Sequence, residues 1–409
     1  MGFGGRFYFS SASQVFRVNK AGVIDMVIGN GAYGISGDGG PATSSNVALG
    51  GPTALASDNS NNLYIADDYA NRIRKVDAAS GIISTIAGSG PIPQESLFNP
   101  NSLAIAGNGD VYVCESGHHR VRKVDAATGI ITTVAGKGDA GDSGTYTGDG
   151  GLATLANLHP NAIALDAAGN LIIADGSDRI CKVTKTTGIN TTIAGNGGFG
   201  LTGDNGPALN AEIGYPVSIQ FDRPGNLYFS SADHNSIRKI TPDGIITTFA
   251  RDGATPTYSG DGGLARQATL PGRGLLSIDG DSNILYSLFL SNEDHEVIRI
   301  DGLTTIVTTV VGTTAALADN IPAHNAQFYW PTGMAVDLAG NVYVADTWSS
   351  SVRKISANTG LITTVAGNGG VSSGDGELAI SARSSSLPVP ERQLGCRSGN
   401  RRRGAGVAV

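Results

Sequence analysis

Short apolar runs separated by small polar turns make up almost the whole chain. Residues 160–195 show the unit clearly, with four runs of four to six residues that are rich in β-branched side chains and bounded by Gly, Asn or Asp. Runs of this length and composition are typical of β-strands. The four runs therefore predict an up-and-down antiparallel sheet. Both faces of the sheet are largely apolar, which predicts that it packs between two other sheets.

This four-strand unit is repeated along the chain. Its second strand carries a recognisable phrase that begins seven times, 48 to 60 residues apart, at Phe7, Leu63, Val111, Leu171, Leu227, Ile284 and Val342. Repeats of this length indicate stacked supersecondary units. Four-stranded sheets that pack radially around an axis form a β-propeller. We therefore expect an all-β propeller of four-stranded antiparallel blades.

The number of sheets follows from the number of strands of each kind. A proline opens the first strand in six units, at Pro52, Pro100, Pro160, Pro216, Pro271 and Pro331. The first residue of a strand is a place where a missing N–H is tolerated. The other three strands are identifiable seven times. We expect seven sheets, the first without its inner strand, and a six-bladed ring with leftover strands is the alternative.

The two rims of such a ring differ in their loops. One rim carries short turns, such as the one in which Asp166 ends a strand and Asn170 follows four residues later. An Asp side chain can bond the backbone two residues on, so this pattern favours a hairpin turn. The other rim carries long and variable loops. Variable loops on a rigid scaffold are the usual place for binding sites.

The repeated phrase resembles a known family. Residues 62–67 (NLYIAD) followed by residues 71–77 (NRIRKVD) are similar to the NHL repeat, and residues 36–43 (SGDGGPAT) resemble the version found in teneurin-like NHL domains and in bacterial multi-repeat proteins. The resemblance covers residues 6–370. It implies a propeller, and it favours a bacterial protein in an extracytoplasmic or secreted location. It implies no single activity, because relatives include protein-interaction and RNA-binding propellers, sensor domains and lyases.

Charge divides the chain into two parts. The net charge is −7, and residues 381–409 hold six Arg and one Glu, or +5, which leaves −12 for the remainder. An acidic body disfavours nucleic acid as a partner, because Lys and Arg supply the affinity for phosphates. We expect a propeller over residues 1–380 and a basic, disordered tail over residues 381–409. No apolar run is long enough to predict a membrane span, and no signal peptide is visible.

Candidate binding residues lie on the rim with the variable loops. The residue before each opening proline changes type from unit to unit and is predicted to face the mouth of the central channel, at Gly51, Asn99, His159, Tyr215, Leu270 and Trp330. Tyr and Trp are common in binding hot spots, so we select Asn99, His159, Tyr215 and Trp330; simple plugging of the channel by bulky side chains is the alternative. The carboxylates that end the second strands are further candidates, at Asp67, Glu115, Asp175 and Asp346.

Metal and catalytic chemistry have weaker signals. The Gly-Asp-Gly loops place one carboxylate each at Asp38, Asp149, Asp204, Asp261 and Asp375. Calcium needs six or more oxygens, so we expect each Asp to organise a turn and cap a short helical stretch. We therefore expect no cofactor, and calcium or another divalent cation is the less favoured alternative. Of the six His residues, four (His118, His119, His234 and His295) are predicted further out than His159. We therefore predict no His cluster, no metal ligands and no catalytic residues.

These observations lead to three functional hypotheses. The first is a non-enzymatic binding module that presents a site for a protein, small-molecule or glycan ligand on the loop-rich rim. The second is a metal-dependent lyase- or lactonase-like enzyme with its site in the channel, which a converging cluster of His, Asp and Glu would favour. The third is a structural unit within a longer surface protein. The propeller is expected to be monomeric or part of such a protein.

Overall fold

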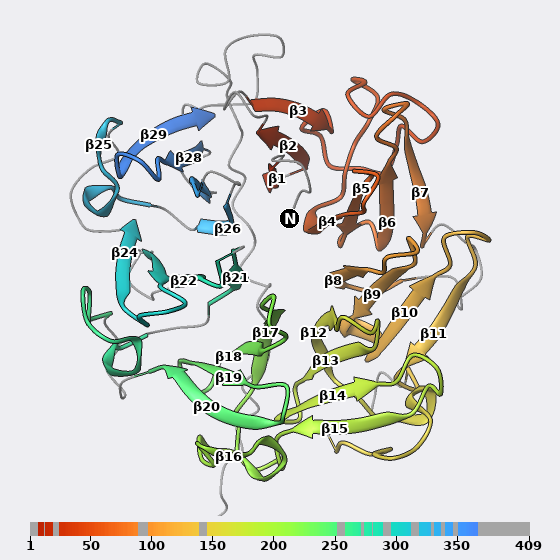
Figure 1. Cartoon of the computed structure of the whole chain (residues 1–409). Helices are drawn as coiled ribbons and strands as arrows, with labels where there is room; N and C mark the ends of the chain where they lie inside the picture. The colour runs from red at the N-terminus through yellow and green to blue at the C-terminus, as the bar shows by residue number, and fades with distance from the viewer. Residues whose placement is uncertain are drawn as a thin grey trace, which may run out of the picture.

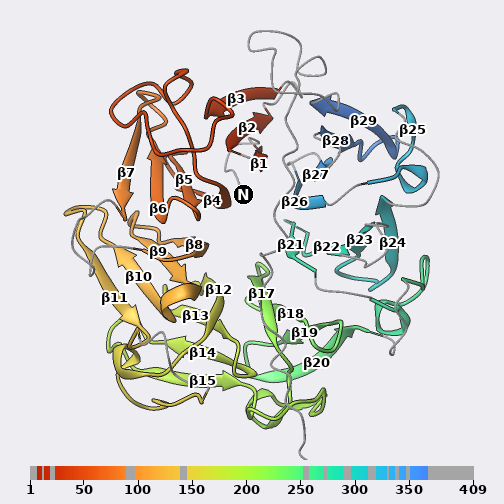
Figure 2. The same ribbon diagram turned by 180° about the vertical axis from the view of Figure 1, so that it is seen from behind.

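Seven antiparallel sheets stand around a ring in the computed structural model (Figures 1 and 2). The structure describes residues 7–11, 13–18, 24–88, 97–138, 145–251, 258–270, 274–279, 281–288, 296–311, 319–328, 331–336, 340–346 and 351–366. Trp330, His295, Asp375 and the basic tail lie outside the described residues. Within the described residues, no helix is long and apolar enough to cross a membrane.

The strands follow one another around the ring in chain order. Blade 1 contains β1 (Phe7–Ser11), β2 (Gln14–Val18) and β3 (Ile24–Ile28). Blade 2 contains β4 (Pro52–Ser57), β5 (Leu63–Asp67), β6 (Arg72–Val76) and β7 (Ile83–Ala87). Blade 3 contains β8 (Pro100–Ile105), β9 (Val111–Glu115), β10 (Arg120–Val124) and β11 (Ile131–Ala135). Blade 4 contains β12 (Pro160–Leu165), β13 (Leu171–Asp175), β14 (Arg179–Val183) and β15 (Asn190–Ala194).

The remaining blades carry the more irregular units. Blade 5 contains β17 (Pro216–Phe221), β18 (Leu227–Ser231), β19 (Ser236–Ile240) and β20 (Ile245–Ala250), with β16 (Gly206–Pro207) outside β20. Blade 6 contains β21 (Leu276–Ile278), β22 (Ile284–Leu288), β23 (Glu296–Ile300) and β24 (Val307–Val311). Blade 7 contains β26 (Pro331–Val336), β27 (Val342–Asp346), β28 (Ser351–Ile355) and β29 (Leu361–Ala366), with β25 (Ile321–Pro322) outside β29.

Blade 1 differs from the other six in its strand count. It is three-stranded, in the order β1-β2-β3, and has no inner strand among the described residues. Its strand β1 contacts the inner strands β4 and β26 on its two sides, which brings the first and last sheets together. The prediction of seven sheets with an incomplete first sheet is confirmed. The ring thus has six complete blades and one three-stranded sheet.

The hydrophobic core lies between neighbouring sheets. All five residues are buried in each of the second strands β5, β9, β13 and β18. One core cluster joins Cys114 and Val121 of blade 3 to Ile163 and Ile173 of blade 4. A strand that is covered on both faces favours a nearly continuous apolar run over alternation, and in these strands the polar residues stand at the end.

The Asp–Asn turns form as the sequence predicts. In blade 4, the backbone N–H of Asn170 donates to Oδ1 of Asp166 (2.8 Å), and the Asn170 side chain donates to the other carboxylate oxygen (2.8 Å). One carboxylate therefore organises the whole turn between the first and second strands. These turns lie on the rim opposite the variable loops.

Long loops cross from one blade to the outer edge of the next. We call these segments outer straps; they comprise residues 36–44, 147–155, 202–210, 259–267 and 319–325 and lie against blades 2, 4, 5, 6 and 7. In blade 2, the N–H of Gly39 donates to the carbonyl of Ile83 (2.9 Å). Each strap thereby pairs with an outermost strand that would otherwise present unpaired backbone groups.

Short 3-10 helices occur within or beside the straps. They are η2 (Ala153–Leu155), η3 (Ala208–Asn210), η4 (Ala265–Gln267) and η5 (Ala323–Asn325); a further one, η1 (Ser116–His118), lies in blade 3. The expected helical stretch is therefore present after Asp149, Asp204 and Asp261, in blades 4 to 6, and it is absent after Asp38 in blade 2. The expected capping by the Asp is wrong, because no side chain caps these helices.

Candidate ligand-binding site

Carboxylates at the ends of the second strands hold the segments that lead into the inner strands. Oδ1 of Asp67 accepts the N–H of Gly50 (2.7 Å), and Oδ2 of Asp175 accepts the N–H of His159 (2.8 Å). These two side chains and those of Glu115 and Asp346 are completely buried. The predicted rim carboxylates therefore lie beneath the rim surface, and those of Asp67 and Asp175 position backbone there.

Burial has an electrostatic consequence at Asp67. It raises the pKa of this carboxyl to about 6, while the Gly50 N–H and the guanidinium of Arg74 act in the opposite direction. The charged form of a buried carboxylate is disfavoured unless donors replace the lost water. The charge of Asp67 therefore depends on the hydrogen-bond donors and cations around it.

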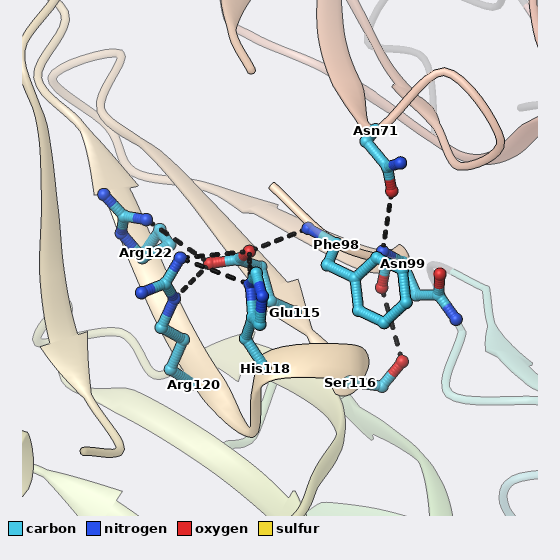
Figure 3. A network of polar contacts seen from close by, with 8 residues as sticks. All are labelled: Asn71, Phe98, Asn99, Glu115, Ser116, His118, Arg120 and Arg122. Atoms are coloured by element: carbon cyan, nitrogen blue, oxygen red, sulfur yellow. Dashed lines mark hydrogen bonds and ion pairs between the residues drawn. The ribbon is translucent and has the colours of Figure 1, made fainter. Parts of the chain in front are cut away.

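Blade 3 carries the most extensive polar network of the rim (Figure 3). Glu115 accepts the N–H of Phe98 (2.9 Å) and pairs with Arg120 Nε (2.7 Å) and Arg122 Nη1 (3.5 Å). His118 Nδ1 lies 3.2 Å from the same carboxylate. The longer Glu side chain, in the place where other blades have Asp, reaches all of these groups at once and holds η1 against the blade.

Asn99 is held by its backbone between two blades. Its N–H donates to Oδ1 of Asn71 in blade 2 (3.1 Å), and its carbonyl accepts the hydroxyl of Ser116 (3.3 Å). Asn71 and Asn99 both have positive φ, 51° and 50°, a conformation that Asn tolerates better than most residues. Asn99 is exposed.

His159 meets a partner that the sequence analysis did not predict. Its ring lies edge-on to that of His119 from blade 3, with ring centroids 4.4 Å apart. Burial, reinforced by His159, lowers the pKa of His119, so this imidazole is held in its neutral form. His119 was predicted to lie further out than His159, and the contact was not foreseen. His119 follows η1 in a left-handed conformation.

Tyr215 and two asparagines continue the site into blades 4 and 5. The Tyr215 hydroxyl donates to Oδ1 of Asn161 (3.1 Å), and Nδ2 of Asn161 donates to the carbonyl of Pro216 (3.0 Å). Nδ2 of Asn101 donates to the carbonyl of Asn161 (3.2 Å). Gly176 lies beneath Tyr215, and a Cβ there would stand 2.9 Å from the Tyr ring. Side chains of successive inner strands therefore join three blades at the rim.

Two buried polar atoms of this cluster have no partner among the described residues. They are Nδ1 of His159 and Oδ1 of Asn101. A carbonyl oxygen can only accept, so the atom of Asn101 that faces Asn161 must be Nδ2, and Oδ1 is the atom left over. Unpartnered buried polar atoms are costly and rare in proteins, and each one requires an explanation.

The other predicted mouth residues take different places. Leu270 is buried in the core between blades 5 and 6, and a side chain at Gly51 would meet the ring of Tyr69. Thus Asn99, His159 and Tyr215 lie on one arc of the rim, from blade 3 to blade 5. Phe98, Asn101, His119 and Asn161 belong to the same arc; adjacency to the opening prolines was the only signal that could have found three of them.

The Asp residues of the straps are engaged within the protein. Asp38 and Asp204 pair with the buried guanidinium groups of Arg74 (2.8 Å) and Arg238 (2.7 Å). Oδ1 of Asp149 accepts the N–H of Thr192. Across the described residues, no group of three or more His, Cys, Asp or Glu side chains is arranged to hold a metal ion. The strap carboxylates thus anchor the straps to the blades.

Comparisons with known proteins agree with this architecture. The model of the NHL repeat matches residues 99–124 and 328–355. Teneurin-1 of Gallus gallus is 27% identical over 225 residues, which is 49% of this chain and 8% of that protein; teneurin-1 of Homo sapiens is 27% identical over 222 residues, 49% of this chain and 7% of that protein. The chain therefore spans less than a tenth of the length of these relatives.

Solved structures show the same fold. A streptogramin B lyase superimposes with a TM-score of 0.53 and 18% identity over 83% of this chain and 87% of that chain. A protein from Lactobacillus plantarum superimposes with a TM-score of 0.54 and 14% identity over 88% of this chain and 94% of that chain. At such identities the likeness concerns the fold alone. The chain is thus a β-propeller with NHL repeats at residues 99–124 and 328–355, and it is distantly similar to the teneurins.

Proposed function

We propose that the chain is a non-enzymatic binding module whose ligand site is the arc of the rim that runs from blade 3 to blade 5. The observation that carries the proposal is the pair of unpartnered buried atoms, Nδ1 of His159 and Oδ1 of Asn101. A ligand that supplied hydrogen bonds to both atoms would remove the free-energy cost of leaving them unpaired.

The surroundings of these atoms suit recognition. The backbone on either side is held by Asp175 and Glu115, and the side chains are linked through Asn161 to Tyr215. A site whose groups are already fixed loses little conformational entropy when a ligand binds. A few convergent polar groups on a rigid wall are typical of ligand sites.

The enzyme hypothesis has less support from the geometry. The completely buried carboxylates Asp67, Glu115 and Asp175 bond backbone N–H groups, and Glu115 also neutralises two arginines. An acid or base catalyst must reach the proton that it transfers. Since these acids face the protein rather than solvent, they are poorly placed for such a role.

A thermal-shift screen tests the proposal without assuming a ligand. Neutral oligosaccharides, free amino acids, proline-rich peptides and nucleotides are added to the purified chain and to the His159→Phe variant. A ligand at a hundredfold excess over its Kd stabilises the folded state by about 2.7 kcal/mol, so a binder raises the Tm of the wild type and not that of the variant. A screen in which no compound acts, or in which hits act equally on both proteins, overturns the proposal.

A further inference from the structure

Two exposed aromatic rings flank the proposed site on neighbouring blades. Phe98, before β8, and Tyr69, between β5 and β6, are 46% and 49% exposed. Each ring lies against a glycine, Phe98 against Gly117 and Tyr69 against Gly51, where any side chain would collide with the ring. A ring supported by backbone on one side and half exposed is positioned to stack with a ligand.

Amides lie beside Phe98 where blades 2 and 3 meet. Asn71 and Asn99 are joined by the hydrogen bond between Oδ1 of Asn71 and the N–H of Asn99, and the exposed side chain of Asn99 is adjacent in sequence to Phe98. The ring of Phe98 in turn packs on that of His118, with centroids 5.3 Å apart. This part of the rim therefore combines aromatic rings with neutral amides.

The charges near Phe98 are turned inward. The side chain of Glu115 is completely buried, and those of Arg120 and Arg122 are only 15% and 4% exposed, because they pair with Glu115 (Figure 3). Within the part of the chain that the structure describes, the charges of Glu115, Arg120 and Arg122 are thus paired beneath the surface around Phe98. A surface that pairs its own charges beneath neutral polar groups favours a neutral ligand over an ionic one.

Building on the function proposed above, we infer that the site takes a neutral oligosaccharide chain, with sugar rings stacked on Phe98 and Tyr69 and hydroxyls bonded to Asn101 and His159. A pyranose presents a face of C–H groups, which suits the negative face of an aromatic ring. Its hydroxyls both donate and accept. Oδ1 of Asn101 requires a donor, and a proline-rich segment lacks N–H donors at its prolines, so the hydroxyl-rich ligand fits better.

Titration calorimetry with neutral and charged sugars tests this inference. The probes are cellohexaose and chitohexaose, a polygalacturonate hexamer as the anionic match, and a proline-rich decapeptide. We expect binding of at least one neutral hexasaccharide. Phe98→Ala should weaken it about tenfold, the equivalent of the 1.4 kcal/mol expected for one aromatic stacking contact. Ile130→Ala is the matched control, because Ile130 is 60% exposed on the opposite rim of blade 3.

The outcomes separate this inference from the broader proposal. Binding of the anionic hexamer or the peptide alone, or neutral-sugar binding that Phe98→Ala leaves intact, overturns the oligosaccharide inference. If no sugar binds but another compound raises the Tm in a way that depends on His159, the oligosaccharide inference fails while the binding module stands. Because half of the Phe98 side chain is exposed, the Ala variant should fold, which its circular dichroism spectrum will show; Tyr69→Ala gives a second, independent reading.

Discussion

The outer straps are anchored in two different ways around one ring. In blades 2, 5 and 7, an Arg in the third strand reaches out to the strap Asp, in the pairs Arg74–Asp38, Arg238–Asp204 and Arg353–Asp319. In blades 4 and 6, the corresponding positions hold Cys181 and Ile298, and the tyrosine directly before the strap occupies the space instead, at Tyr146 and Tyr258. The strap persists although the residue beneath it changes from a cation to a small or apolar side chain.

The strap Asp explains this tolerance. The fourth strand of each blade contains a bulge, and the Asp accepts a threonine N–H there, from Thr192 to Asp149, Thr309 to Asp261 and Thr364 to Asp319. A bulge removes a residue from the regular ladder, and the Asp supplies the missing acceptor. In blade 7 the same Asp also binds Arg353. The backbone bond is therefore common to the Tyr-type blades 4 and 6 and to the Arg-type blade 7, and the Arg or Tyr fills the remaining space.

Blade 3 also has an arginine at this position of the third strand. Arg122 occupies the position of Arg74 and Arg238, and it pairs with Glu115 (3.5 Å). The same carboxylate pairs with Arg120 (2.7 Å) and lies 3.2 Å from Nδ1 of His118 in η1. In this blade the arginine of the third strand therefore contacts the polar network of the candidate site.

The largest effect is expected from breaking an Arg-type anchor. Arg238→Ala removes a guanidinium that is completely buried and that donates to Asp204 (2.7 Å) and to the carbonyls of Glu212 and Thr202 (both 3.1 Å). We expect a loss of about 3–5 kcal/mol in the free energy of unfolding, because the change leaves a large cavity and removes the donor of two carbonyl oxygens. Urea denaturation measures it.

Cys181→Ala is the matched control at the same position of a Tyr-type blade. It should cost only about 1 kcal/mol, since one buried sulfur atom is lost. Equal losses in the two variants would show that the two anchors do not differ in energy.

The pKa of Asp67 should depend on the positive charge of Arg74. Burial raises the pKa of this carboxyl in the folded chain to about 6, from the 3.8 of an ordinary Asp. The unfolded chain therefore loses the proton first as pH rises. Stability should therefore fall between pH 4 and pH 6, by on the order of 2–3 kcal/mol. Asp67→Asn should flatten that part of the stability curve. Arg74→Met, which removes a cation that lowers this pKa, should move the fall to higher pH; carbonyl NMR of Asp67 reports the same shift directly.

Replacing the Tyr-type anchor of blade 4 by an Arg-type anchor should change the stability by an intermediate amount. Cys181→Arg places a guanidinium where Tyr146 and its bonds to Asn190 and Thr192 already fill the space, and overpacking should cost about 2 kcal/mol. Adding Tyr146→Leu copies the arrangement of blade 5, where Leu201 occupies the equivalent strap position. The double variant should regain at least half of the loss through a new pair with Asp149. Additive effects of the two changes in thermal melts would contradict this account.

Much of the fold could be predicted from the sequence, because each structural feature has a local signal. Apolar runs, opening prolines such as Pro160 and turns such as Asp166–Asn170 depend on neighbours in the chain, and they gave the seven sheets and the incomplete first one. The outer straps were not predicted. Their pairing partners lie in the next blade, about 40 residues away, and a two-residue strand such as β16 has no periodicity to detect.

The candidate site was predicted only in part for a similar reason. Adjacency to an opening proline identified Asn99, His159 and Tyr215, since every unit places that residue on the same rim. The contact of His159 with His119 depends on the left-handed turn after η1, and that turn depends on the Glu115 network. Contacts between blades have no signature in the repeat itself, so they required the structure.

The smallest expected effect concerns the cost of keeping a site ready for its ligand. His159→Phe preserves a ring against His119 but removes Nδ1, which is buried and unpartnered within the described residues. Removing such an orphan should raise the free energy of unfolding by about 1 kcal/mol, the reverse of what most core substitutions do. His234→Phe is the matched control, because Nε2 of His234 is likewise buried and unpartnered there while its ring packs on Phe199 rather than on His119. Both variants should be slightly more stable in urea, and only His159→Phe should lose ligand binding, since stability and function commonly oppose each other at a binding site. If His159→Phe instead destabilises the chain while His234→Phe does not, Nδ1 of His159 serves the fold, and the argument for a ligand at that atom is withdrawn.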